Sequence, residues 1–226
     1  SGPQDEDLVR REEPGYTGLE RCASCHTNNY AEWKKSLHSQ AMAVPADSTI
    51  VGDFDNAQHS YGGVTSRMFW ENENAFMETV GADGQLQTYR IGYTIGVRQH
   101  QAYLTQFPKG RYQVLPLYHD GKTKRWVDAQ EGKVVEHPGP LSQDDFYFWT
   151  NRGRTWNYHC FDCHASRVEK NYDLNSDSYR TTVGSLTIDC EACHGPSQRH
   201  DETRGTPDSM HLVDLKALSA EQSVEV

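Results

Sequence analysis

The first segment with a regular apolar pattern lies at residues 27–42 and predicts a helix. Its larger apolar side chains recur every three or four positions, the spacing of one helix face; they are Tyr30, Trp33, Leu37 and Ala41. Thr27 or Asn28 can serve as the N-cap. Residues 1–15 carry many charges and no such pattern, so we expect a flexible N-terminal arm there.

Between about residues 75 and 128 the pattern changes to that of β-strands. Alternate positions from Ile91 to Val97 are apolar. Turn residues divide the region at 81–84, at 108–110 and at Asp120-Gly121, and the last pair is a strong β-hairpin signal. We therefore predict a small antiparallel β region at about 75–128.

Beyond residue 145 the chain is dense in aromatic residues, Cys and His, with little periodicity of any kind. Residues 213–218 return to a loosely helical spacing of apolar side chains. Together these patterns predict one α+β domain with much irregular structure over residues 16–226, with the β region as an insertion.

The composition is poor in side chains that can form a core. Only 35% of the 226 residues are apolar, and the mean hydropathy is −0.82. Five Trp, twelve Tyr and seven Phe nevertheless argue against general disorder. A large apolar cofactor resolves the conflict, because it supplies buried surface that side chains would otherwise provide.

The formal net charge of −10, with no cluster of Lys and Arg, argues against a nucleic-acid partner. No apolar run approaches the roughly 18–20 residues that span a bilayer, so we expect no transmembrane segment.

The six cysteines fall into three pairs, and a His follows each pair directly. Two thiols three residues apart can form thioethers with the two vinyl groups of one haem, and the next residue then lies where its imidazole can bind the iron. We therefore predict three c-type haems, held by Cys22, Cys25 and His26, by Cys160, Cys163 and His164, and by Cys190, Cys193 and His194.

Two other uses of paired cysteines explain the pattern less well. A zinc ribbon takes four ligands from two pairs, which leaves the third pair unused and gives no reason for the His that follows each pair. A disulfide oxidoreductase uses one pair near a βαβ unit, which this chain lacks. Haem attachment takes place outside the cytoplasm, so we expect a periplasmic or extracellular protein whose signal peptide has been removed.

Eight further histidines are candidates for the second axial ligand of each iron. If residues 27–42 are helical, His38 lies about 18 Å from His26, too far for both to bind one iron. His38 would then serve a different haem. His159 and His200 adjoin the haem-attachment motifs and are also better placed for a neighbouring iron.

The chain resembles the c554-like family of multihaem cytochromes, whose members are often fused to tetratricopeptide repeats. The resemblance covers roughly residues 16–226 and rests on the segments that join the motifs, such as EWKKSLHSQAM, GDFDNAQHSYGG and CEACHGPSQRH. It implies that His38 and His200 are distal ligands. A third ligand would come from the segment around His59; His119, His137 and His159 stay open as alternatives.

The chain departs from the family at two points. Relatives often have His where this chain has Phe148, and they often continue past a segment like LSAEQSVEV into a fourth motif. Either one haem and one ligand have been lost together, or the chain is a fragment of a longer protein.

The sequence therefore predicts electron transfer through three haems, mostly with two His ligands each, to and from redox partner proteins or other haem subunits. One alternative is a multihaem reductase with one open haem site. Another is a subunit of a polymeric extracellular haem wire, which would make the chain part of a homo-oligomer or filament.

Overall fold

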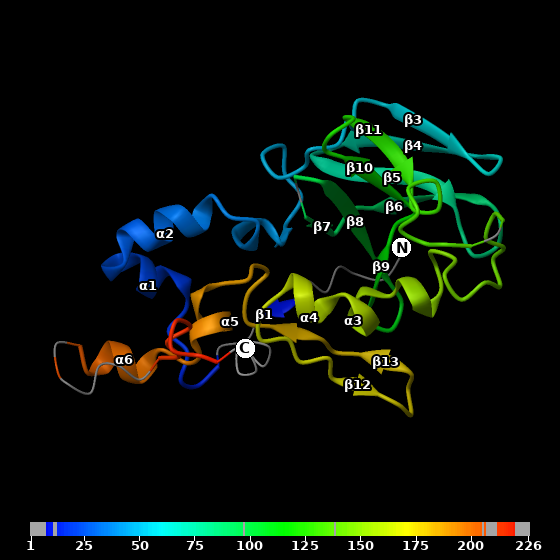
Figure 1. Cartoon of the computed structure of the whole chain (residues 1–226). Coiled ribbons are helices and arrows are strands. Elements are labelled where there is room, and N and C mark those ends of the chain that lie inside the picture. Colours follow the sequence, from blue (N-terminus) through cyan, green and yellow to red (C-terminus); the bar gives the residue numbers. More distant parts are fainter. Residues whose placement is uncertain are drawn as a thin grey trace.

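A computed structural model of the chain describes residues 8–10, 13–96, 98–137, 139–204, 206 and 212–219. Figure 1 shows a β-rich part, coloured cyan to green, beside a part made of short helices and irregular chain. The fold is therefore α+β, as predicted.

Four strands form an antiparallel meander in which each strand pairs with the next in the sequence. They are β3 (Ala57–Tyr61), β4 (Val64–Glu71), β5 (Asn74–Val80) and β6 (Leu86–Arg90). In β5 the buried side chains are those of Ala75, Met77 and Thr79, so the pleat turns every second residue inward.

A second sheet has six strands and lies against the meander (Figure 1). Its order is β11 (Arg125–Asp128), β10 (Leu117–Asp120), β8 (His100–Phe107), β7 (Tyr93–Ile95) and β2 (Met42–Ala43), and β9 (Arg111–Val114) also pairs with β8. All of these pairings are antiparallel.

The six-stranded sheet has a core on each face. Tyr103 of β8 points into one core with Met68 and Met77 of the meander. Leu104, the next residue, points into the other core with Trp156. Because neighbouring residues of a strand face opposite sides, this one strand joins the meander on one side to the helical part on the other.

The remaining elements are short. The helices are α1 (Leu19–Cys25), α2 (Thr27–Lys34), α3 (Trp156–His159), α4 (Phe161–His164), α5 (Cys190–His194) and α6 (Gln198–Glu202), with 3-10 turns η1 (His38–Gln40) and η2 (Arg152–Arg154). Two-residue strands pair as β1 (Val9–Arg10) with β14 (Thr182–Val183) and as β12 (Tyr172–Asp173) with β13 (Ser178–Tyr179). No helix among the described residues is long and apolar enough to cross a membrane.

The hairpin predicted at Asp120-Gly121 is confirmed, since β10 and β11 pair from Leu117↔Asp128 to Asp120↔Arg125. The turns predicted at 81–84 and 108–110 also join paired strands. The β region is larger than predicted, because the meander begins at Ala57 rather than near residue 75, and β2 at Met42–Ala43 joins the second sheet. Polar residues on the exposed positions of β3 hide its alternation from a search for apolar periodicity.

Two sequence expectations need correction. The helix predicted over 27–42 ends at Lys34, and the chain continues through η1 into β2. The arm expected at 1–15 is not loose at residues 8–10: Leu8 is buried and its backbone nitrogen donates to the Tyr93 hydroxyl at 3.0 Å. The last residues of the chain, 220–226, lie outside the described part.

Candidate haem-binding site

Each Cys-x-x-Cys-His motif lies on or beside a short helix. Cys22 and Cys25 belong to α1, Cys163 and His164 to α4, and α5 consists of Cys190–His194. Residues three and four apart lie on one helix face. The helical turn therefore places both thiols and the imidazole of a motif on the same side, as attachment of one haem requires.

The first and third motifs meet, although 168 positions separate Cys22 from Cys190. Together they line a cavity of about 230 Å³, whose walls include Cys22, Cys25, His26, Cys190, His194 and His200. The thiols of Cys22 and Cys190 are hydrogen-bonded, which raises the pKa of Cys22 and lowers that of Cys190 to about 7.

The rings of His26 and His200 both line this cavity. Their centroids are 6.1 Å apart and their planes are 24° apart. With a metal–nitrogen bond of about 2 Å and a centroid roughly 1 Å behind the nitrogen, two imidazoles on one metal place their centroids about 6 Å apart. The separation of these two rings therefore fits an iron between them.

Glu191, inside the third motif, ties the two motifs together. Its buried carboxylate accepts hydrogen bonds from the backbone nitrogens of Thr17 at 3.0 Å and Gly18 at 2.9 Å, just before α1. It also accepts from Ser197 through the backbone nitrogen and the hydroxyl, at 3.1 and 2.6 Å. Gly18 has φ +82°, a conformation that favours glycine, so the sequence permits this turn into α1.

A charged pair fixes the start of α5. Asp189 caps the helix by accepting from the backbone nitrogen of Ala192 at 3.1 Å. Arg167 donates to the same carboxylate oxygen at 2.9 Å and stacks on Tyr16. The second and third motifs are therefore linked, because Arg167 lies three residues beyond His164.

Backbone groups contact the histidines of the second and third motifs, His164 and His194. Nδ1 of His194 lies 2.9 Å from the carbonyl oxygen of Val213. A proton on Nδ1 leaves the lone pair on Nε2, the nitrogen that would bind iron. Burial lowers the pKa of His164, and a hydrogen bond with the backbone of Ala41 opposes that shift.

The second motif is anchored to the six-stranded sheet through α3. Trp156 is fully buried in the core that contains Leu104. The side-chain oxygen of Asn157 accepts from the backbone nitrogen of Tyr112 at 2.7 Å, and its nitrogen donates to Thr181 at 2.8 Å. Cys160 is the residue that directly follows α3. Burial raises the pKa of its thiol, and the positive charge of Arg154 offsets part of that shift.

The segment around His38 passes between the second and third motifs. The carbonyl of His38 accepts from the backbone nitrogen of Ile188, two residues before α5, at 3.0 Å. Ala41 contacts His164 at the other end of the segment. The ligation of an iron by His38 stays a prediction.

His59 and the alternative third ligands lie elsewhere. His59 is on β3, where its Nε2 lies 2.9 Å from the carboxylate of Glu131. His119 is buried on β10 against Trp126, and His137 lies near Asp145. His159 is exposed and packs edge-on against Tyr158. The structure does not bring His59 to a motif, so its role as third ligand also stays a prediction.

Sequence reasoning missed the polar residues that hold the motifs together. Glu191 occupies a variable position of its motif, and nothing in the sequence marks it as a partner of residues near position 18. Asp201 likewise pairs with Arg21 at 2.8 Å and with Arg204 at 3.1 Å on one wall of the shared cavity. These contacts join segments that only the fold brings together.

Comparison with known proteins agrees with this arrangement. The structure is similar to the crystal structure of the outer cell wall cytochrome OcwA, with a TM-score of 0.55 and 18% sequence identity over 92% of this chain. The match covers 36% of the OcwA chain, so this chain spans about a third of that protein and the similarity concerns the fold alone. No curated protein matches the sequence.

The family model for cytochrome c554 and c-prime matches residues 21–60 and 119–195, just over half of the chain. The matched ranges contain all three Cys-x-x-Cys-His motifs. On this evidence the chain belongs to the cytochrome c554 and c-prime family, and it is a multihaem c-type cytochrome of electron transport.

Proposed function

We propose that this chain is an electron relay with three covalently attached haems. Cys22 and Cys25, Cys160 and Cys163, and Cys190 and Cys193 would form the thioethers, and His26, His164 and His194 would be the proximal ligands. Each bound haem supplies reversible one-electron chemistry at its iron. The chain contributes the attachment points, the axial imidazoles and the hydrogen bonds that orient them.

The pairing of His26 with His200 is the observation that carries this proposal. An iron with an imidazole on each side has no open position for a substrate, which favours electron transfer over catalysis. The 6.1 Å centroid separation supports His200 as the distal ligand of the first haem, although its nearest motif in the sequence is the third. A ligand exchanged between motifs would hold two haems close together.

For the other two irons we propose His38 as a distal ligand of the second or third haem, with His59 as the third distal ligand. The contacts of segment 38–41 with Ile188 and His164 support the first assignment. The second rests on the family resemblance alone. A reductase with one open haem and a subunit of a haem wire are the competing functions.

We also propose that the protein works outside the cytoplasm with redox partner proteins or other haem subunits. Attachment of c-type haem outside the cytoplasm supports this location, and OcwA is an outer cell wall cytochrome. The net charge of −10 favours partners that present a basic surface.

The test combines haem counting with spin state. Mass spectrometry of the denatured protein should show the polypeptide plus three haems. Electron paramagnetic resonance of the oxidised protein should show low-spin iron only. His200→Ala should convert one iron to high-spin and let it bind cyanide, whereas His100→Ala, a change on the exposed start of β8, should alter neither property.

An unchanged low-spin spectrum in His200→Ala would remove this histidine from the ligand set. High-spin iron in the parent protein, with ready binding of nitrite or cyanide, would favour the reductase instead. Filaments seen by electron microscopy of the purified protein would favour the haem wire.

A further inference from the structure

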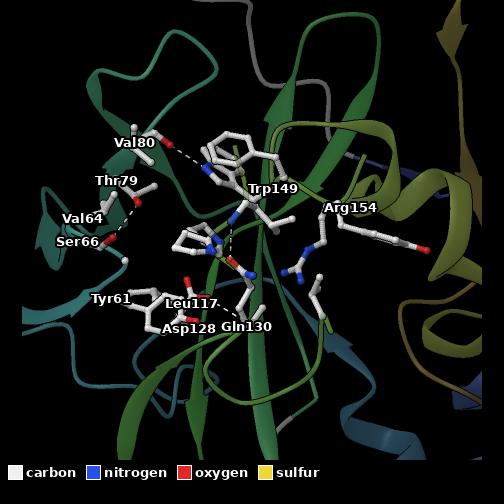
Figure 2. A pocket seen from close by; sticks show the side chains of 18 of the residues that line it. Tyr61, Val64, Ser66, Thr79, Val80, Leu117, Asp128, Gln130, Trp149 and Arg154 are labelled. Atoms are coloured by element: carbon white, nitrogen blue, oxygen red, sulfur yellow. Dashed lines mark hydrogen bonds between the residues drawn. The ribbon is translucent and has the colours of Figure 1, made fainter. Parts of the chain in front are cut away.

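A cavity of about 90 Å³ lies in the β-rich part, away from the cysteine motifs. Its walls come from the meander, from the β10–β11 hairpin and from the chain between residues 128 and 154, and no motif residue lines it. Figure 2 shows these side chains around the hollow. A space of this size holds several waters or one small molecule. His59, the proposed third distal ligand, lies on the rim formed by β3 and is held there by Glu131; the electron-relay proposal uses no other residue of the wall.

Arg154 brings a positive charge to this cavity without a matching negative charge. One of its terminal nitrogens donates to the carbonyl oxygen of Leu115 at 3.0 Å. Its Nε is shielded from solvent and has no hydrogen-bond partner. Among the described residues, no carboxylate comes within ion-pair distance of this guanidinium. An unpaired donor of a charged group that is shielded from solvent is costly unless an acceptor arrives from outside the chain.

The acidic residue in the same wall does not fill this role. Asp128 already accepts from the backbone nitrogen of Gln130 at 2.8 Å. Burial raises the pKa of Asp128, and the charge of Arg154 opposes that shift without a direct contact. Asp128 is therefore supplied with a donor, whereas the Nε of Arg154 has no acceptor.

Three other polar side chains of the wall, those of Ser66, Thr79 and Gln130, have partners within the chain. The hydroxyls of Ser66 and Thr79 lie 2.7 Å apart. Gln130 donates to the carbonyl oxygen of Gly139 and accepts from the backbone nitrogen of Leu141. The group that the cavity lacks is thus an acceptor that carries negative charge.

We propose that this cavity binds a small carboxylate through the guanidinium of Arg154. Figure 2 shows the guanidinium directed toward the side of the cavity that holds Gln130 and Asp128. The planar fork of an arginine matches the two oxygens of a carboxylate. Leu117, Val80 and Trp149 give the wall an apolar part, which suits a short hydrocarbon tail.

A carboxylate could reach Arg154 from solution or from a propionate of the haem at Cys160. The charge of the Arg154 guanidinium lowers the pKa of the Cys160 thiol, which places the two groups near each other. Thioethers form on the vinyl side of a porphyrin, whereas its propionates are on the other side of the ring. The geometry therefore favours a free carboxylate from solution.

The experiment titrates the haem-loaded protein with acetate and butyrate, with sodium chloride at matched ionic strength as the reference, and follows the binding heat. The parent should bind at least one carboxylate saturably. Arg154→Gln should weaken binding by about tenfold or more, because it removes a charge-assisted hydrogen bond. Asp128→Asn should tighten binding, since it removes a neighbouring negative charge and keeps an oxygen for the Gln130 nitrogen.

Arg152→Gln is the matched control. Arg152 lies two residues away in η2, carries the same charge and stacks on Tyr158 outside the cavity. Its variant should bind carboxylate within about twofold of the parent, because surface charges separated from a site by solvent are screened.

Three outcomes would overturn the proposal. The first is that the parent responds to carboxylates and to chloride alike. Alternatively, Arg154→Gln would unfold more readily than the parent in carboxylate-free buffer while the parent binds nothing, which would make Arg154 a structural donor to Leu115. Lastly, Arg154→Gln would shift the midpoint potential of one haem while no carboxylate binds, which would identify a propionate as the partner. The parent and Asp128→Asn titrations remain decisive if Arg154→Gln fails to fold.

Discussion

The carboxylate of Glu191 accepts a hydrogen bond from the backbone nitrogen of Gly18 at 2.9 Å, across 173 positions of sequence. Gly18 directly precedes α1, which holds Cys22 and Cys25, and Glu191 lies between the cysteines of the third motif. One buried side chain therefore sets the distance between two haem-attachment sites. Because electron exchange between haems depends on their spacing, this contact belongs to the function as well as to the fold.

Replacement of Glu191 by Ala should destabilise the protein by at least about 3 kcal/mol, since it leaves several buried donors without an acceptor. Glu191→Gln should cost less, because one oxygen remains. Denaturant unfolding of the haem-loaded protein measures both. Glu202→Ala is the control: this exposed residue of α6 pairs with Gln198, and its loss should change stability by less than about 0.5 kcal/mol. Equal stability of the Glu191 and Glu202 variants would contradict the role of Glu191.

Trp156→Ala should lower the free energy of unfolding by about 3–5 kcal/mol, the cost of removing a fully buried aromatic side chain. Trp156 packs beneath the six-stranded sheet and precedes Cys160 by four residues, so its loss should also loosen the second motif. Leu174→Ala, at a site that is 80% exposed, is the matched control and should be nearly neutral. A small effect of Trp156→Ala would mean that the haem, not this core, holds the motif.

We expect the contact of Asp177, in the β12–β13 hairpin, with β9 to depend on pH in the acid range. Hydrogen bonds from Arg111 and Tyr172 lower the pKa of this carboxyl to about 2, from an ordinary value of 3.8. A carboxyl with a depressed folded pKa stabilises the fold above its unfolded pKa, and that contribution disappears as the pH falls from 3.8 toward 2. Asp177→Asn should therefore flatten the pH profile of stability in this window.

Arg111→Gln serves as the companion variant for Asp177. Because both residues belong to one contact, the effects of Asp177→Asn and Arg111→Gln should overlap, and the double variant should be no worse than the stronger single variant. Additive effects would show that Asp177 acts through other groups.

The sequence predicts the haem motifs and the hairpin at Asp120-Gly121 because each depends on neighbours in the chain. Two thiols and an imidazole within five residues need one helical turn, and Asp-Gly needs one turn between two strands. The predicted helix at 27–42 is too long for a different reason. Its apolar face continues past Lys34, but Met42 pairs with Ile95 of β7, so the end of the predicted helix is a strand of the sheet.

The polar contacts of the site could not be predicted in this way. Glu191 and Ser197 meet Thr17 only after the fold brings the third motif against α1. Arg154 belongs to no motif, and the unpaired state of its Nε is visible only when the surrounding wall is known. The cores also differ from expectation. The low apolar content indicated that a cofactor supplies buried surface, and the β-rich part in addition has side-chain cores on both faces of its larger sheet.

The contrast between the β-rich part, which has its own side-chain cores, and the short helices predicts how a haem-free form will behave. The meander and the six-stranded sheet bury large side chains between them, including Met68, Met77 and Tyr103. By contrast α1, α2 and α6 bury no residue of their own, and each has eight residues or fewer. Helices of that length are unstable in water without tertiary packing.

In a chain with all six cysteines replaced by Ala, amide hydrogen exchange should therefore remain slow in β4, β5, β8 and β10. Exchange should become fast in α1, α2 and α6, which the haem-loaded protein protects. Fast exchange throughout would mean that the side-chain cores cannot fold the sheets without haem. Slow exchange in α1 and α2 would mean that these helices do not depend on haem, and the low apolar content would then need another explanation.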